Sequence, residues 1–208
     1  MSNNKNDSKS QIAAKTSKSG VGKRNPRSFI ERFSDRTLIR KKDVKIERRN
    51  GQVFIFNRAF FNEATGNPYL TAPDSLDDEQ ILEILHDLNG AYKQGYDDGI
   101  DTLHDIYKER REDAPINIAY DDCVLIREQD AIIKRYNRRA FLFDATYLGD
   151  KDRIMGPRLS APDCLSDEQI IKMIPDLNRA YRKGYEDCLA ARNDIFDMWN
   201  KEQNRKTI

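Results

Sequence analysis

The chain is poor in the residues from which catalytic and metal sites are most often built. Its 208 residues include 3 cysteines, 2 histidines and 1 tryptophan. Cys123, Cys164 and Cys188 are odd in number, lie far apart and form no C-x-x-C motif. This pattern argues against a disulfide framework or a metal role, and it favours a reducing, cytoplasmic location. His86 and His104 lie too far apart in the sequence to form a ligand pair on one helix.

The known catalytic motifs are absent as well. The sequence contains no G-x-S-x-G, no H-E-x-x-H and no complete phosphate-binding loop. The fragment Gly20 to Lys23 lacks the first glycine, the hydroxyl residue and the preceding strand of such a loop. We therefore predict a protein that is not an enzyme, with no catalytic residues, no metal and no cofactor.

Long hydrophobic runs are absent. The longest apolar run is four residues, as in 53–56, whereas a membrane span needs about 20. The N-terminus also lacks the apolar segment of a secretory signal. We expect no membrane partner.

What the chain does contain is a block that occurs twice. Residues 70–99 and 159–188 are separated by a constant 89 positions without a gap, and 17 of the 30 positions are identical. Self-similarity at a fixed offset indicates an internal duplication. Because one copy alone would bury only a marginal core, we expect the two copies to pack into one body.

The first half of each copy is predicted to be β-structure. In the first copy Val44 and Ile46 on one side and the apolar run 53–56 on the other flank Asn50-Gly51, and this dipeptide is the strongest short signal for a β-hairpin. In the second copy we interpret 128–130 as the equivalent turn, although its chemistry is weaker.

A short motif follows the first hairpin and recurs in the second copy. Arg-Ala-Phe at 58–60 matches Arg-Ala-Phe at 139–141 with an offset of 81, so we take the two arginines as equivalent. The change of offset from 81 to 89 then requires an eight-residue insertion within 147–158, where glycine and proline predict a loop.

The second half of each copy is predicted to be helical. Asp77 and Ser166 are each followed three residues later by glutamine, which is the spacing of a capping box. Apolar or small residues then recur at helical spacing to about residues 109 and 202. Because Pro175 stands where the first copy has His86, we predict a short helix, a break near these positions, and a long helix.

Each long helix carries small residues at every fourth position. Glycine inside a helix costs about 1 kcal/mol relative to alanine, so we infer that these positions allow the backbones to approach closely. We predict that the two long helices cross here about a pseudo-two-fold axis, flanked by tyrosines. A homodimer that uses the same face is the competing arrangement. The packing residues are Ala91, Gly95, Gly99, Ala180, Gly184 and Cys188, and the tyrosines are Tyr92, Tyr96, Tyr181 and Tyr185.

The net charge of +1 conceals an uneven distribution. Residues 1–49 hold 15 Lys or Arg and 5 Asp or Glu, whereas the remaining 159 residues hold 21 and 30. Residues 1–27 have almost no large apolar side chains, which predicts a disordered basic arm. Ser28 and Glu31 then have capping-box spacing, and we predict a short amphipathic helix over about 29–38.

The basic residues give the first functional hypothesis, a nucleic-acid-associated protein. Lysine and arginine side chains of the arm would neutralise phosphates, and basic residues on the strands would add a second contact. The alternative for these side chains is pairing with the body's excess acids. The candidate nucleic-acid-binding residues are Lys23, Arg24, Arg27, Arg32, Arg36, Arg40, Lys41, Lys42, Arg58 and Arg139.

The acidic helices give the second hypothesis, a protein-protein interaction module such as an adaptor, inhibitor or assembly component. There the acidic face around Asp97, Asp98 and Asp101, or the cleft between the copies, would bind the partner. A third hypothesis is an enzyme whose site lies at the interface of the copies around the tyrosines and around Asp74 and Asp163, the paired acids of the two Ala-Pro-Asp motifs.

The sequence therefore predicts an α+β protein made by internal duplication of a unit that contains a β-hairpin or strand, a short helix and a long helix. A disordered basic N-terminal arm precedes the two copies. The predicted organisation is an arm over 1–27, a short amphipathic helix and linker over 28–42, repeat 1 over 43–112 and repeat 2 over 119–203, with both repeats packed as one body.

Overall fold

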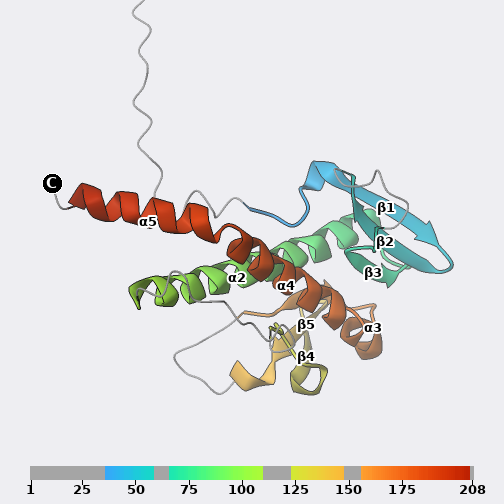
Figure 1. Cartoon of the computed structure of the whole chain (residues 1–208). Coiled ribbons are helices and arrows are strands. Elements are labelled where there is room, and N and C mark those ends of the chain that lie inside the picture. The colour runs from blue at the N-terminus through green and yellow to red at the C-terminus, as the bar shows by residue number, and fades with distance from the viewer. Residues whose placement is uncertain (1–35, 59–65, 110–122, 148–155, 207–208) are drawn as a thin grey trace, which may run out of the picture. The chain divides into compact units, whose positions relative to one another are not determined.

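A computed structural model describes residues 36–58, 66–109, 123–147 and 156–206. The fold is α+β, with two three-stranded antiparallel sheets and a set of helices (Figure 1). The predicted arm over 1–27 and most of the predicted helix over 29–38 lie outside the described residues. Residues 36–38 are described and are not helical.

The first sheet contains the predicted hairpin. Asn50 and Gly51 connect its first two strands and have φ angles of 52° and 74°, the left-handed values that a tight two-residue hairpin turn requires. A third strand then pairs with the second. The elements are η1 (Lys41–Asp43), β1 (Val44–Arg49), β2 (Gln52–Asn57) and β3 (Leu70–Pro73).

The second sheet has the same order and the same register. Its hairpin turns at Asn137-Arg138, whose φ angles are 53° and 59°, and not at 128–130 as the sequence analysis expected. Residues 128–130 instead form a 3-10 turn that leads into the sheet. The elements are η4 (Glu128–Asp130), β4 (Ala131–Tyr136), β5 (Arg139–Asp144), η5 (Ala145–Tyr147) and β6 (Leu159–Pro162).

This register corrects the equivalence of Arg58 and Arg139. In the sheets Gln52 pairs with Pro73, and Arg139 pairs with Pro162, so Arg139 corresponds to Gln52. Arg58 follows the end of β2 instead. The offset between the hairpins is 87, so the loop before β6 is longer than its counterpart by two residues and not by eight.

The helical halves start as predicted but differ in continuity. Both capping boxes are confirmed, at Asp77 with Gln80 and at Ser166 with Gln169. The first copy then forms one unbroken helix, so the expected break near His86 is absent, whereas the second copy breaks before Pro175 and again at residue 191. The helices are α2 (Asp78–Lys108), α3 (Asp167–Ile171), α4 (Ile174–Ala190) and α5 (Arg192–Lys206).

Proline explains why only the second copy is broken. Pro175 lies in the first turn of α4. Backbone N–H groups in a first turn make no hydrogen bond within the helix, so the missing N–H of proline costs nothing there. His86 has an N–H group and therefore fits the interior of α2.

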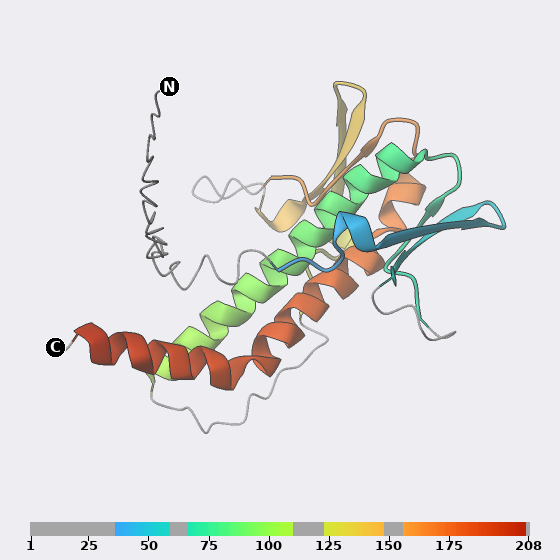
Figure 2. The ribbon, with the colours of Figure 1, turned by 90° about the horizontal axis from the view of Figure 1, so that it is seen from above.

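The helices α2 and α4 run side by side in the same direction (Figure 2), and α2 also contacts β6 of the second copy. A Cβ atom added at Gly95 would lie 1.9 Å from the Tyr181 carbonyl oxygen, and one added at Gly184 would lie 1.9 Å from the Tyr92 carbonyl oxygen. Gly99 faces Cys188 in the same way, with 2.8 Å between its added Cβ and the cysteine Cβ. Glycine at these positions is what allows the two backbones to touch.

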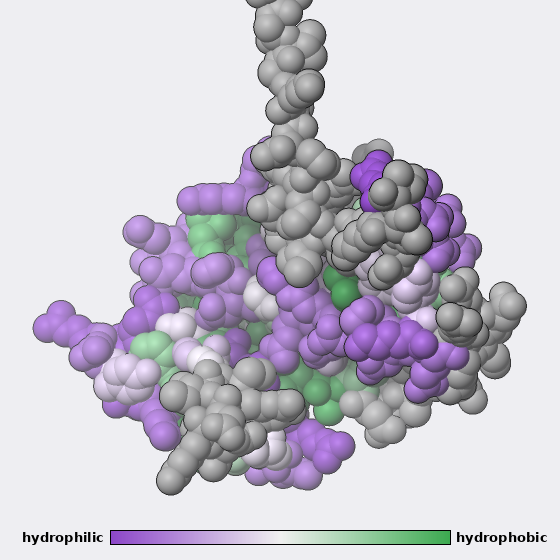
Figure 3. Space-filling view, turned by 90° about the vertical axis from the view of Figure 1, so that its left-hand side faces the viewer, coloured by the Kyte–Doolittle hydropathy of each residue, from purple (hydrophilic) through white to green (hydrophobic). Residues whose placement is uncertain are grey.

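The two copies share one hydrophobic core. The inner faces of both sheets contribute alternate residues such as Val53 and Leu142, and the helices contribute residues such as Leu88 and Leu177. On the face drawn in Figure 3, hydrophilic residues cover most of the coloured surface, and hydrophobic ones appear in small patches between them. None of the helices in the described ranges has the length and apolar character that a membrane span requires.

The core also includes residues ahead of each hairpin. Leu38 and Ile39 are buried, and Asn89 of α2 holds Ile39 by accepting from its N–H and donating to its carbonyl. Asn178 of α4 makes the same pair of bonds to Ile126. The folded unit of the first copy therefore begins by Leu38, ahead of the expected boundary at 43.

Candidate binding cleft between the two repeats

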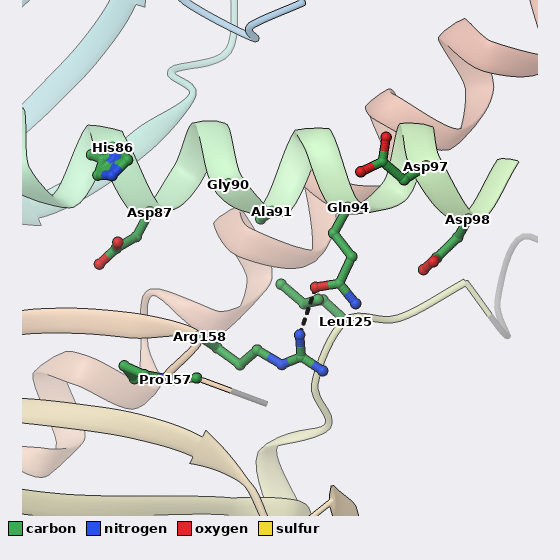
Figure 4. A pocket seen from close by; sticks show the side chains of 11 residues that line it. His86, Asp87, Gly90, Ala91, Gln94, Asp97, Asp98, Leu125, Pro157 and Arg158 are labelled. Carbon is green, nitrogen blue, oxygen red and sulfur yellow. Dashed lines mark hydrogen bonds between the residues drawn. The ribbon is translucent and has the colours of Figure 1, made fainter. Parts of the chain in front are cut away.

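A cleft of about 540 Å³ lies between α2 of the first copy and the segment that leads into β6 of the second (Figure 4). Its volume is in the range of small-ligand sites, roughly 300–1,000 Å³. The residues that line it are mostly polar or small: His86, Asp87, Gly90, Ala91, Gln94, Asp97, Asp98, Leu125, Gly156, Pro157 and Arg158.

Asp87 fixes the geometry at one end of the cleft. Its Oδ2 atom accepts a 2.6 Å hydrogen bond from the backbone N–H of Ser160 on β6. No hydrogen bond from a described residue ends on its Oδ1 atom. Burial is the main cause that raises the pKa of this carboxyl. The carboxylate is thus held in place by one oxygen while the other remains available to a donor.

Asp176 of α4 makes the corresponding contact across the pseudo-two-fold axis. Its Oδ2 atom accepts a 2.8 Å hydrogen bond from the N–H of Thr71 on β3. Each long helix therefore anchors the third strand of the other copy through a carboxylate. These two aspartates were not singled out in the sequence, although both belong to an Asp-Leu-Asn triplet that is identical in the two copies.

The predicted acidic residues lie further along α2. Asp97 and Asp98 line the cleft, whereas Asp101 is exposed and is not among the lining residues. Asp98 points toward the side where Arg158 lies, and Asp97 points away from it (Figure 4). Lys93 donates a hydrogen bond to Asp97.

Asp98 is tied to the opposite helix. It accepts a 2.7 Å hydrogen bond from the Tyr181 hydroxyl, and the equivalent pair, Tyr92 and Asp187, is joined at 3.0 Å. Burial raises the pKa of Asp98, and the bond from Tyr181 opposes that change. Burial and the nearby Asp187 raise the pKa of Tyr92, so the tyrosines act as donors at neutral pH.

Arg158 forms the far wall of the cleft. Its Nη1 atom donates a 2.5 Å hydrogen bond to Oε1 of Gln94, one helical turn beyond Gly90 (Figure 4). One end of the cleft is therefore acidic, at Asp87. At the other end the Arg158 guanidinium lies beside Gln94 and Asp98.

The predicted nucleic-acid-binding residues lie partly inside and partly outside the described part of the chain. Lys23, Arg24, Arg27 and Arg32 lie outside it. Arg36, Arg40, Lys41, Lys42 and Arg58 are exposed, and the Arg36 guanidinium lies over the Tyr96 ring at 5.0 Å. Arg139 is largely engaged, because it donates to Ser160 and to Glu83 at 2.8 and 2.9 Å.

Two further strand arginines have structural partners. Arg48 donates to the carbonyl oxygens of Asp74 and Leu76 and to the carboxylate of Asp78. Arg135 holds the equivalent loop of the second copy, including the carboxylates of Asp163 and Asp167. These arginines tie each hairpin to the loop and first turn of its own helix.

The two acids weighed for an enzyme site lie at the surface of the described part of the chain. Asp74 and Asp163 are exposed, and Asp163 pairs with Arg135. The described residues include no group of three or more His, Cys, Asp or Glu side chains that could hold a metal ion. Burial raises the pKa of the Cys188 thiol to about 12, so this cysteine is a protonated packing residue at neutral pH.

Comparison of the chain with known protein families, curated proteins and solved structures finds no match.

Proposed function

We propose that this protein is a non-enzymatic interaction module whose acidic cleft binds a basic segment of a protein partner. The observation that carries the proposal is the cleft between the copies, with Asp87 and Asp98 pointing into it from one helix. An adaptor, an inhibitor or an assembly component would each fit this proposal.

Charge supports the choice of a basic partner. The 159 residues after Arg49 hold 21 Lys or Arg and 30 Asp or Glu. A surface of one sign raises the rate at which an oppositely charged partner is captured, and the effect falls as salt rises. We expect binding through the cleft to be salt-dependent.

The test is a matched pair of charge reversals. Asp97→Lys with Asp101→Lys reverses two charges that act on Asp98 at one end of the cleft. Asp194→Lys with Asp197→Lys makes the same change of charge on exposed positions of α5. Asp98 is left intact because it accepts a hydrogen bond from Tyr181. A fluorescent nonapeptide of alternating Arg and Ser serves as the probe, and anisotropy measures its affinity.

We expect the α2 pair to weaken binding about tenfold, which corresponds to about 1.4 kcal/mol. The α5 pair should change the affinity much less, because its charges lie on another element. Equal losses in the two pairs would mean that the peptide senses only the net charge, and the cleft would then have no specific role.

A second candidate is nucleic-acid association, and one feature favours it. On the outer face of the second sheet Tyr136 stacks on Phe141 with 4.2 Å between ring centroids, and Tyr136 is 48% exposed. Lys134 lies beside them, with its Nζ 5.5 Å from the Phe143 ring centroid. Exposed aromatic rings with basic neighbours on a sheet are typical of surfaces that stack single-stranded bases.

This candidate is tested by titrating single-stranded RNA and duplex DNA at low and moderate salt. The variants are Tyr136→Ala and a chain without residues 1–35. The deletion ends at 35 because Leu38 and Ile39 belong to the core. Stacking on Tyr136 predicts a loss of RNA affinity of about 1–3 kcal/mol for Tyr136→Ala. No binding by the full chain at low salt would remove the candidate.

A further inference from the structure

The two copies differ at one position that decides whether the cleft is open. Gly90 of α2 corresponds to Arg179 of α4, and the flanking residues Asn89 and Ala91 are identical to Asn178 and Ala180. The glycine has no side chain, whereas the arginine has a long one with a positive charge.

In the second copy Arg179 occupies the site that corresponds to the acidic end of the cleft. Its Nη2 atom lies 2.9 Å from Oδ1 of Asp176. Its Nη1 atom donates a 2.8 Å hydrogen bond to the Pro68 carbonyl oxygen. Two nitrogens of one planar guanidinium thus bind a carboxylate on the helix and a carbonyl of the other copy, while Oδ2 of the same carboxylate holds Thr71.

In the first copy the equivalent acceptors are present without the arginine. Asp87 corresponds to Asp176, and Pro157 corresponds to Pro68; both line the cleft. Oδ2 of Asp87 holds Ser160 as Oδ2 of Asp176 holds Thr71. A Cβ atom added at Gly90 would meet nothing within 4 Å. The space that Arg179 fills in one copy is therefore open in the other.

We propose that this end of the cleft is a receptor for one arginine side chain of the partner segment. The guanidinium binds Oδ1 of Asp87 and the Pro157 carbonyl oxygen in the way that Arg179 binds Asp176 and Pro68. This inference rests on the proposed function and names the residue type that the cleft selects. Arg179 shows, within the same chain, the ligand chemistry that this arrangement of acceptors accommodates.

The geometry favours arginine over lysine. The two acceptors are a carboxylate and a carbonyl reached by two different nitrogens of the fork, and an ammonium group has no planar fork with which to match them. Arg158 limits the site on its other side, because its guanidinium lies at Gln94. Arg158 therefore bounds the receptor on the side away from Asp87.

The first measurement compares two small probes on the full chain. N-acetyl-arginine-N-methylamide and N-acetyl-lysine-N-methylamide are titrated into ¹⁵N-labelled protein, and the amide signals of Gly90 and Gly156 are followed. We expect saturable shifts at these glycines with the arginine probe and an affinity about fivefold or more weaker for the lysine probe. Equal affinities, or shifts elsewhere only, would overturn the arginine receptor.

Variants provide the second measurement. Gly90→Arg supplies the missing side chain from within and is expected to abolish arginine binding. Ala190→Arg adds the same charge at an exposed position of α4 and serves as the control. Asp87→Asn keeps an oxygen for the Ser160 N–H but removes the charge, and it should also abolish binding.

The symmetry provides a gain-of-function test. Arg179→Ala empties the equivalent site, so the arginine probe should bind at a second place and shift signals near Asp176 and Pro68. This result does not depend on the identity of a partner. If Gly90→Arg leaves probe binding intact and Arg179→Ala creates no second site, the receptor is wrong.

These outcomes separate the receptor from the wider proposal. Suppose that the Arg-Ser peptide binds, that the α2 charge reversals weaken its binding, and that the arginine and lysine probes bind equally. The proposed function of the acidic cleft would then be supported, and its selectivity for arginine would be disproved. If neither the peptide nor the probes bind at low salt, both proposals fall.

Discussion

At the scale of single residues, the glycines at the helix crossing have no space for a side chain. An added Cβ at Gly95 or Gly184 would lie 1.9 Å from a backbone oxygen of the other helix. Because backbone cannot rotate out of the way as a side chain can, the helices must separate. Overpacking of this kind costs about 1–3 kcal/mol or more, and the helix propensity gained from alanine offsets about 1 kcal/mol of it at most.

We therefore expect Gly95→Ala and Gly184→Ala to lower the free energy of unfolding by about 2 kcal/mol each. Urea titration followed by circular dichroism measures the change. Gly90→Ala on the same helix is the matched control, since it meets no neighbour. It should raise stability by about 0.5–1 kcal/mol. Stabilisation by all three substitutions would show that the helices do not cross at these glycines.

The carboxylate of Asp87 makes a prediction about pH. Burial raises its pKa above the ordinary value of 3.8, so just above that pH the folded chain still holds a proton that the unfolded chain has lost. Unfolding then releases the proton, and this group's contribution to the free energy of unfolding falls as pH rises through the window between 3.8 and the raised pKa. Above that window the contribution is constant.

Asp87→Asn removes this titration and keeps an oxygen for the Ser160 N–H. The stability of the natural chain relative to this variant should therefore decrease with rising pH in that window, as measured by thermal unfolding from pH 3 to pH 8. Asp101→Asn on the exposed side of the same helix is the control for the general effect of one carboxylate less. A relative stability that increases with pH would contradict burial as the dominant cause.

At the scale of elements, the strands show what the sequence could and could not reveal. The dipeptide Asn50-Gly51 predicts its hairpin because glycine adopts positive φ easily. Asn137-Arg138 makes the same turn with an arginine at φ 59°, which the residue types do not announce. The Arg-Ala-Phe motif predicts an offset of 81 residues between the two hairpins. The observed offset is 87, and it aligns the strand residues 53–56 with 140–143.

The sequence analysis expected a cleft between the copies, but the contact of Asp87 at its end was beyond local sequence reasoning. The periodicity of the helices and their capping boxes follows from residues close together in the chain. The contact between Asp87 and Ser160 joins residues 73 positions apart, and only the packing of the two copies brings them together. The repeat did contain a usable signal, because Asp87 and Asp176 stand at equivalent positions of an Asp-Leu-Asn triplet that is identical in the two copies.

In the second hairpin turn the backbone of Arg138 is strained, whereas the first copy has a glycine at the equivalent position. A non-glycine residue in the left-handed region costs roughly 1 kcal/mol, and Arg138 occupies that region where the first copy has Gly51. Arg138→Gly should therefore raise the free energy of unfolding by about 0.5–1 kcal/mol. Gly51→Arg should lower it by a similar amount. Urea midpoints measure both, and a destabilising Arg138→Gly would show that the arginine makes contacts that outweigh its backbone strain.

At the scale of the whole molecule, near-symmetry and its exceptions have different consequences. The reciprocal bonds, Tyr92 with Asp187 and Tyr181 with Asp98, hold the copies together in the same way on both sides of the axis. The exceptions distinguish the two sides, because Gly90 leaves open a site that Arg179 fills. One substitution, glycine in place of arginine, is therefore enough to open a site in one copy, while the rest of the interface holds the two copies together.

The packing of the copies predicts that they unfold together. Trp199 of α5 is the single tryptophan of the chain, and its ring packs on His104 and Tyr107 of α2 with centroids 5.5 and 5.2 Å apart. Its fluorescence therefore reports on contacts between the copies, while circular dichroism at 222 nm reports on all helices. With one continuous core, the two signals should follow a single transition with one midpoint in urea. Gly184→Ala should shift both midpoints equally. A tryptophan transition at lower urea, unmoved by Gly184→Ala, would show that α5 detaches from a body whose two copies remain folded.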